Sequence, residues 1–147
     1  MGLLQSEIPD GLVKAYRSAH YQAGPGPDLI TLHVDQYSAR LSQLFNVSGH
    51  QCAAFITACN PFGVRQNPES NRAACAALRN RLDEYVSHSD QVIEGTGSDP
   101  REGWSPEESF LVLGLNLEEA RRLGREFRQN AIVWAGKDAI PKLILLR

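Results

Sequence analysis

Apolar and polar positions along the chain follow two different periods. Residues 29–34 alternate between apolar and polar side chains, which predicts a half-exposed strand. Residues 52–58 and 109–115 are apolar on both faces, so we expect two central strands there. Three shorter stretches complete the predicted strands, at residues 91–96, 131–135 and 142–146.

A period of about 3.6 residues marks the helices. The longest is expected at residues 68–88, where Asn67 can cap the first turn and Pro68 suits the first helical position. Its apolar stripe consists of Cys75, Leu78, Leu82 and Tyr85. Three further helices are predicted at residues 10–20, with Asp10 as N-cap, at 38–45 and at 117–129.

The interleaving of these elements predicts an α/β (α+β) fold. We expect a single domain over residues 1–147, with a mixed, roughly six-stranded sheet and about four helices packed on it. The strands before and after the long helix are expected to run parallel through a right-handed crossover, and the last two strands to form a hairpin. Residues 1–9 are expected to form a flexible or loosely packed arm.

Composition narrows the function classes. Fifteen Lys and Arg against seventeen Asp and Glu give a net charge of −2, so no basic field exists for nonspecific nucleic-acid binding. We find no secretion signal and no apolar run that could span a membrane, which favours a cytoplasmic protein. The cysteines form no C-x-x-C pair and favour a reducing compartment over a disulfide framework or a zinc site. They are Cys52, Cys59 and Cys75.

The first candidate site is the loop that follows the strand at 52–58. In α/β sheets, ligands bind where strands end and helices begin. Thr57, Asn60 and Asn71 can donate and accept hydrogen bonds at such a place. The alternative is structural: Asn60 makes a turn with Pro61, and no ligand is involved.

The second candidate is an acidic stretch at residues 94–109. Its carboxylates suit Mg²⁺ or acid/base chemistry, although no fixed metal-ligand spacing appears and a solvated loop is the alternative. Trp104 either walls a ligand pocket or covers the core. Thr96, Asp99 and Glu107 are the other candidate ligand-binding residues here. The carboxylates are Glu94, Asp99, Glu102, Glu107 and Glu108.

The third candidate is the helix at 117–129. Arg121, Arg125 and Arg128 lie within a narrow arc beside its apolar face and can hold phosphate or carboxylate groups. Ordinary helix pairing is the alternative, since Arg is favourable near a helix C-terminus. Gln129 and Asn130 follow, either as a helix cap or as part of the same pocket.

Three segments together carry a family resemblance. They are residues 54–58 (AFITA) with Asn60-Pro61, residues 95–109 from the GTG triplet through Trp104 to EES, and residues 124–134 (GREFRQNAIVW). Over about residues 20–135 the chain resembles a bacterial family catalogued as domain of unknown function 3293. The resemblance implies a bacterial cytosolic protein without an established activity. One departure from the family pattern is Gly63, where Ser is usual.

These candidates support three hypotheses from different classes. The first is a domain that binds a small polar ligand, a nucleotide or a phosphorylated metabolite, with amides and an aromatic side chain reading the base and Arg holding phosphate. The second is a protein-interaction or regulatory domain without catalysis, whose partner the sequence does not identify. The third is a metal-dependent phosphoester hydrolase that uses the acidic stretch.

Overall fold

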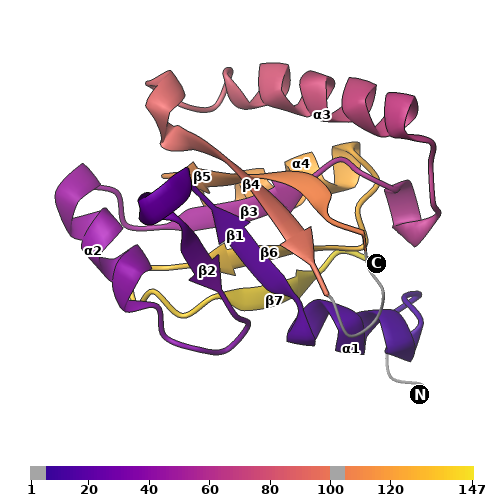
Figure 1. Ribbon diagram of the computed structural model, residues 1–147, viewed down its shortest axis with the longest axis horizontal. Coiled ribbons are helices and arrows are strands. Elements are labelled where there is room, and N and C mark those ends of the chain that lie inside the picture. The colour runs from indigo at the N-terminus through magenta and orange to yellow at the C-terminus, as the bar shows by residue number, and fades with distance from the viewer. Residues whose placement is uncertain (1–5, 100–104) are drawn as a thin grey trace.

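Seven strands form the sheet that organises the molecule (Figure 1). The structure is a computed structural model, and it describes residues 6–99 and 105–147. The strands are β1 His20–Ala23, β2 Ile30–Leu32, β3 Ala53–Thr57, β4 Val92–Ser98, β5 Glu107–Leu113, β6 Ala131–Ala135 and β7 Lys142–Leu145. They lie in the order β2-β1-β4-β5-β3-β6-β7. With four α-helices packed around this one sheet, the predicted α+β class is confirmed.

Polar caps define the helices. These are α1 Asp10–Ser18, α2 Ala39–Ser48, α3 Pro68–Leu82 and α4 Leu117–Glu126. The predicted cap of the longest helix is confirmed, because the side chain of Asn67 accepts a hydrogen bond from the backbone N–H of Ser70. This helix ends at Leu82 and does not reach His88. The side chain of Gln91 accepts from the backbone N–H of His88, so this segment is satisfied without helical bonds.

The first helix has a different N-cap from the one predicted. Its N-cap is Pro9, and Asp10 lies in the first turn, where a negative charge is favourable. Residues 6–9, within the expected N-terminal arm, lie against the rest of the molecule. Ile8 is 3% exposed, and the hydroxyl of Ser6 donates to the carbonyl oxygen of Arg147 at 2.7 Å.

All strand pairings among the described residues are antiparallel, which corrects the expectation of a mixed sheet. β3 and β4 do point in the same direction, because each pairs antiparallel with β5, but β5 lies between them. Consecutive strands such as β4 and β5 pair antiparallel at little cost in loop-closure entropy. This pairing places β5 next to β4, between β4 and β3. The hairpin predicted for the last two strands is confirmed as β6 and β7.

The additional strand is β1, which follows α1 after a single residue. The sequence pattern does not predict β1, because the strand is only four residues long and the predicted helix extends over its first residue, His20. β1 pairs on both sides, with β2 and with β4. These neighbours supply the hydrogen bonds and packing that so short a stretch needs, and β4 is distant from β1 in sequence.

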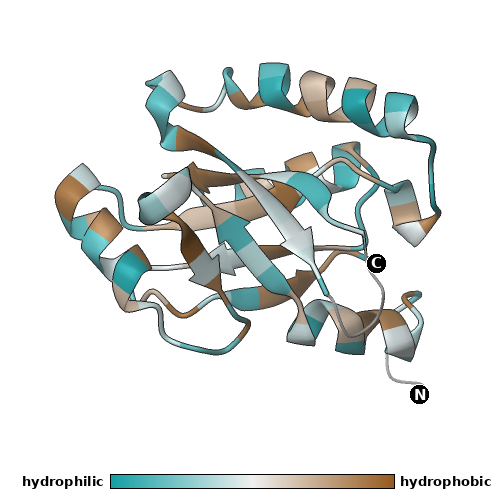
Figure 2. Ribbon diagram, viewed as in Figure 1, coloured by the Kyte–Doolittle hydropathy of each residue, from teal (hydrophilic) through white to brown (hydrophobic). Residues whose placement is uncertain are grey.

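A hydrophobic core lies on each face of the sheet. On one face, here called the inner face, Leu41 of α2 packs with Phe55 and other strand residues. On the outer face, α3 and α4 bury Leu78 and Leu123 against Phe110 and its neighbours. Figure 2 shows the helices with alternating hydrophilic and hydrophobic bands, as expected for elements with one face on a sheet. Within the described ranges, no helix combines the length and the apolar character needed to cross a membrane.

Candidate functional site

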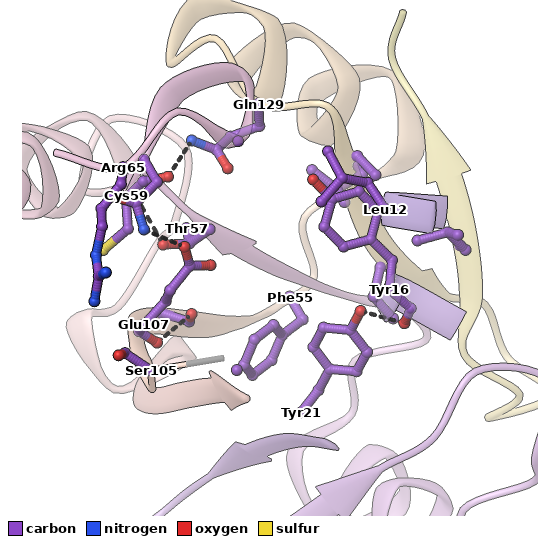
Figure 3. Close-up of a pocket in the computed structure, with 18 residues that line it drawn as sticks. Leu12, Tyr16, Tyr21, Phe55, Thr57, Cys59, Arg65, Ser105, Glu107 and Gln129 are labelled. Carbon is purple, nitrogen blue, oxygen red and sulfur yellow. Dashed lines mark hydrogen bonds between the residues drawn. The ribbon is translucent and has the colours of Figure 1, made fainter. Parts of the chain in front are cut away.

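A cavity of about 280 Å³ opens on the inner face, beside α1 (Figure 3). Residues of α1 and of six strands line it. The sheet curls far enough that β1 and β7, with four strands between them, contribute to the same cavity. Ligand pockets typically measure about 300–1,000 Å³, so the size suits a small molecule.

Apolar and aromatic side chains form one side of the cavity. Leu12 and Tyr16 come from α1, Tyr21 from β1 and Phe55 from β3 (Figure 3). The rings of Tyr21 and Phe55 meet edge to face, with 5.2 Å between their centroids. Tyr21 is paired in register with Gly97 of β4, which has no side chain and leaves space beside the two rings.

Polar side chains form the other side. Thr57 ends β3 and Asn60 follows in the loop, while Glu107 begins β5 and Gln129 comes directly after the turn that ends α4. Thr57 faces the cavity because alternate residues of a strand share a face, and Phe55, two positions earlier on β3, also lines the cavity. Arg65 also lines the cavity and is exposed to solvent.

Asn60 holds Glu107 in place. Its Nδ2 donates to Glu107 Oε2 at 2.6 Å. Its Oδ1 accepts from Asn71 Nδ2 and from the backbone N–H of Gln66, both at 2.9 Å. The backbone of Asn60 has φ of 48°, a left-handed conformation that Asn tolerates better than most residues. The loop therefore presents an oriented amide to the carboxyl group.

The environment of Glu107 changes its acidity. Burial raises the pKa of this carboxyl above its ordinary value, and the hydrogen bond from Asn60 offsets part of the rise. Glu107 therefore keeps its proton to a higher pH than a solvated carboxyl, and in that form it can both donate and accept hydrogen bonds. A carboxyl with a perturbed pKa inside a cavity is typical of functional sites.

The C-terminal end of α4 brings Gln129 to the cavity. The N–H of Arg128 donates to the carbonyl of Arg125, and the N–H of Gln129 donates to that of Gly124. This is a Schellman motif, with Arg128 at φ of 56° in the position usually taken by Gly. The Gln129 side chain then donates from Nε2 to the carbonyl of Cys59 at 3.1 Å. Gln129 thus both closes the helix and lines the cavity.

Strained backbone surrounds the rim. Phe62 has φ of 55°, and its N–H donates to the carbonyl of Arg128 at 2.7 Å. Its ring lies under the guanidinium of Arg147, 4.2 Å from Cζ. Gly63 has φ of 76°, which favours glycine, and a Cβ there would lie 3.2 Å from Leu12 Cδ1, so a larger residue would also crowd α1. Such strain is concentrated at functional sites.

Hydrogen bonds fix α1 over the cavity. The Tyr21 hydroxyl donates to the carbonyl of Tyr16 at 2.6 Å, and Asn130 Nδ2 lies 3.0 Å from the Tyr16 hydroxyl oxygen. Arg147 donates in turn to Asn130 Oδ1 at 2.9 Å. Burial raises the pKa of both tyrosines, so both stay neutral. Asn130 therefore anchors the helix that covers the cavity.

The structure brings six of the ten predicted ligand-binding residues to the cavity. Thr57, Asn60, Glu107 and Gln129 line it. The side chain of Asn71 is hydrogen-bonded to Asn60, and that of Asn130 is hydrogen-bonded to the hydroxyl of Tyr16. These residues come from the first two candidate segments and from the end of the third. Their convergence follows from the pairing of β3 with β5 and the position of α4 beside β6.

Three of the other predicted residues lie apart from the cavity lining. Asp99 is buried and accepts a hydrogen bond from the hydroxyl of Ser18 at 2.6 Å. Thr96 is exposed on the outer face of β4, and Arg125 is exposed on α4, apart from the cavity lining. Trp104 lies outside the described residues.

The acidic stretch does not converge on a single point where it is described. Glu107 faces the inner side, whereas Glu108 and Glu94 lie at outer-face positions of β5 and β4. Glu102 lies outside the described residues. Within residues 6–99 and 105–147, no group of three or more His, Cys, Asp and Glu side chains is placed to hold a metal ion.

Sequence reasoning missed the aromatic side of the cavity. Phe55 was assigned to a central strand, where any large apolar residue is expected in the core. Tyr21 lies in the strand that was not predicted, although the alternation of Ala19, Tyr21 and Ala23 is a weak strand signal. Tyr16 carried no signal, because a tyrosine on an amphipathic helix is ordinary.

Comparison with known proteins identifies a family. The model of the family described as "Protein of unknown function (DUF3293)" matches residues 56–132, more than half of the chain. The matched region contains all four predicted residues that line the cavity. No curated protein and no solved structure matches the chain. The chain therefore belongs to the family of proteins of unknown function DUF3293.

Proposed function

We propose that the protein binds a small polar molecule with a planar ring, of the nucleoside or nucleotide class, in the inner-face cavity. One observation carries this proposal: a cavity of about 280 Å³ combines an aromatic side with a polar side that holds a perturbed carboxyl. An aromatic side recognises the face of a ring, and oriented polar groups recognise its edge.

Glu107 is the side chain that would form hydrogen bonds with the edge of the ligand ring. It is fixed by Asn60, and its raised pKa allows it to act as acceptor or as donor. Nucleobases present donors and acceptors side by side along one edge, which matches such a carboxyl. Thr57 and Gln129 lie on the same side and add further polar atoms.

The charges decide the orientation of the ligand. Glu107 is partly buried, whereas Arg65 is exposed and is the one Lys or Arg among the described lining residues. A phosphate placed beside Glu107 would be repelled, whereas a phosphate near Arg65 keeps its contact with water. We therefore place the ring inside and any phosphate at the mouth. The proposed function is ligand binding in a reducing cytoplasm, and it includes no catalysed reaction.

Thermal melting against a panel of nucleosides and nucleotides, with and without Mg²⁺, tests the proposal. A ligand at 100 times its dissociation constant adds about 2.7 kcal/mol, or roughly 5–10 °C for a domain of this size. A nucleoside without phosphate should be sufficient to raise the melting temperature. A phosphate group should raise it further through its contact with Arg65, and added salt should weaken that further rise. A dependence on Mg²⁺ would indicate metal binding by the acidic stretch.

A matched pair of variants ties a shift to the cavity. Ala131 lines the cavity, so Ala131→Leu fills part of it and should abolish the shift. Ala76→Leu makes the same change on the exposed surface of α3 and should preserve the shift. A panel without any shift, or a shift that survives Ala131→Leu, would sink the proposal and favour the protein-interaction hypothesis.

A further inference from the structure

Two buried thiols face each other at the wall of the cavity. Cys59 follows β3 and lines the cavity, and Cys75 lies in the middle of α3. Their sulfur atoms are 3.4 Å apart, close enough for one thiol to donate to the other. Both sulfurs also lie 3.6 Å from the carbonyl oxygen of Glu108. The ligand-binding proposal uses neither thiol.

We propose that Cys59 and Cys75 are a redox-active pair, in which a small hydroperoxide oxidises Cys59 and Cys75 then closes a disulfide. A disulfide needs an S–S distance of about 2.05 Å. The sulfurs must therefore approach by little more than 1 Å, a movement of the size that side-chain rotation supplies. The inference is independent of which ligand occupies the cavity.

The surroundings assign the two roles. The hydrogen bond between the thiols lowers the pKa of Cys59 and raises that of Cys75, so Cys59 is the thiol that ionises. Cys59 is also the member of the pair that lines the cavity, so it is the nearer of the two to a molecule as small as hydrogen peroxide that enters there. Cys75 is 1% exposed and lies on the helix behind it.

The reaction balances with one peroxide for each pair. The Cys59 thiolate attacks one peroxide oxygen and the O–O bond breaks, which gives a sulfenic acid and, after protonation of the leaving hydroxide, water. The Cys75 sulfur then attacks Cys59 Sγ, the S–S bond forms, and the hydroxyl leaves with the proton of Cys75 as a second water. Two thiols lose two electrons in total, and the peroxide gains them.

The third cysteine provides an internal control. Cys52 lies at the start of the same strand and donates to the carbonyl of Leu115 at 3.3 Å. Burial raises the pKa of Cys52, and among the described residues its thiol is hydrogen-bonded to a backbone carbonyl and not to another thiol. Peroxide should therefore oxidise Cys59 at least ~10-fold faster than Cys52, because the thiolate is the attacking species.

Mass spectrometry of the full chain treated with hydrogen peroxide tests the pair. In a Cys52→Ser background, the monomer should lose about 2 Da, a bond should join the peptides that carry Cys59 and Cys75, and dithiothreitol should reverse both. Adding Cys75→Ser should stop the reaction at a sulfenic acid on Cys59, which dimedone labels. If that variant does not fold, Cys75→Ala serves the same purpose.

Two results would overturn the inference. One is a wild-type protein in which Cys59 and Cys75 stay reduced at a peroxide dose that oxidises half of Cys52. The other is a disulfide that joins two chains or that involves Cys52. Both are read from the unmodified sequence by peptide mapping, so they do not depend on whether a variant folds.

Discussion

At the scale of single residues, Glu107 carries two opposing influences. Burial disfavours its charged form, whereas the amide of Asn60 favours that form by donating to Oε2. Burial is the larger influence, so the pKa is raised. A carboxyl in this position makes the folded state less stable when it ionises, and a protein that retains such a group commonly uses it.

Replacement of this carboxyl should change how stability depends on pH. With a raised pKa, the folded state binds the Glu107 proton more tightly than the unfolded state does. Stability therefore falls as pH rises above the ordinary value of 4.5 and through the folded pKa. Glu107→Gln keeps an acceptor for Asn60 and removes this fall, so the variant should be the more stable protein at neutral pH.

Urea unfolding at a series of pH values measures this effect. The stabilities of wild type and Glu107→Gln should converge below pH 4.5, where the carboxyl is protonated in both states. Glu108→Gln is the matched control, because it removes an exposed carboxyl on the opposite face of β5. A Glu107→Gln variant that is less stable than wild type at neutral pH would contradict the assignment.

At the scale of elements, β1 and β4 approach each other closely at Gly95. A Cβ on Gly95 would lie 2.1 Å from the carbonyl oxygen of Gln22, a backbone atom that cannot move aside alone. Two residues along β4, a Cβ on Gly97 would lie 3.6 Å from the ring of Tyr21, an ordinary contact. The first glycine of the GTG triplet therefore allows strand pairing, and the second leaves room in the cavity.

The two glycines should respond differently to the same substitution. Gly95→Ala should lower the free energy of unfolding by about 1–3 kcal/mol, because β1 must shift away from β4. Gly97→Ala should change it by less than about 1 kcal/mol, since the methyl group fits beside the rings and reduces chain entropy in the unfolded state. Chemical denaturation of the two variants measures both values. Equal losses would show that the close approach at Gly95 is not the cause.

At the scale of the whole molecule, one sheet serves two cores. Phe110 and Leu111 are adjacent on β5 and face opposite sides, and β3, β4, β6 and β7 likewise place residues in both cores, whereas β1 and β2 contribute to the inner-face core. α2 covers one core, while α3 and α4 cover the other. If one core unfolded alone, it would expose one face of strands whose other face still belongs to the second core. Unfolding of the two cores should therefore be cooperative.

Matched truncations on the two faces test this cooperativity. Leu41 and Leu78 are each 0% exposed, on α2 and α3 respectively. Leu41→Ala and Leu78→Ala should each cost about 2–5 kcal/mol of stability. In both variants, far-UV and near-UV circular dichroism should report the same single transition. Two separated transitions in either variant would indicate that the cores unfold independently.

Much of the fold was readable from local patterns. Alternating segments and runs that are apolar on both faces located all the strands except β1, and Asn67 marked the start of α3 as predicted. Helix ends were harder to place. Arg128 takes the left-handed position that closes α4, and a rule that expects Gly there extends the helix too far.

The candidate site was readable in part. Thr57 and Asn60 were predicted because they follow a buried strand, and Glu107 and Gln129 because polar groups stand at element ends. Trp104 lies outside the described residues, so its role stays a prediction. Asp99 was a candidate on charge alone, yet it bonds to Ser18, a partner 81 positions away that no local pattern reveals.

The sequence by itself determined the elements other than β1, the α+β class and the strand-end loop that carries Asn60. These depend on which face of each element is apolar and on which residues cap it, and both properties are local. Only the tertiary structure decided that β5 lies between β3 and β4 and that Tyr21, Phe55 and Glu107 share one cavity. Strand order and sheet curl arise from contacts between distant segments. They depend on the free energy gained by packing those segments against the entropy lost in closing the loops between them, and no local sequence pattern reveals that difference.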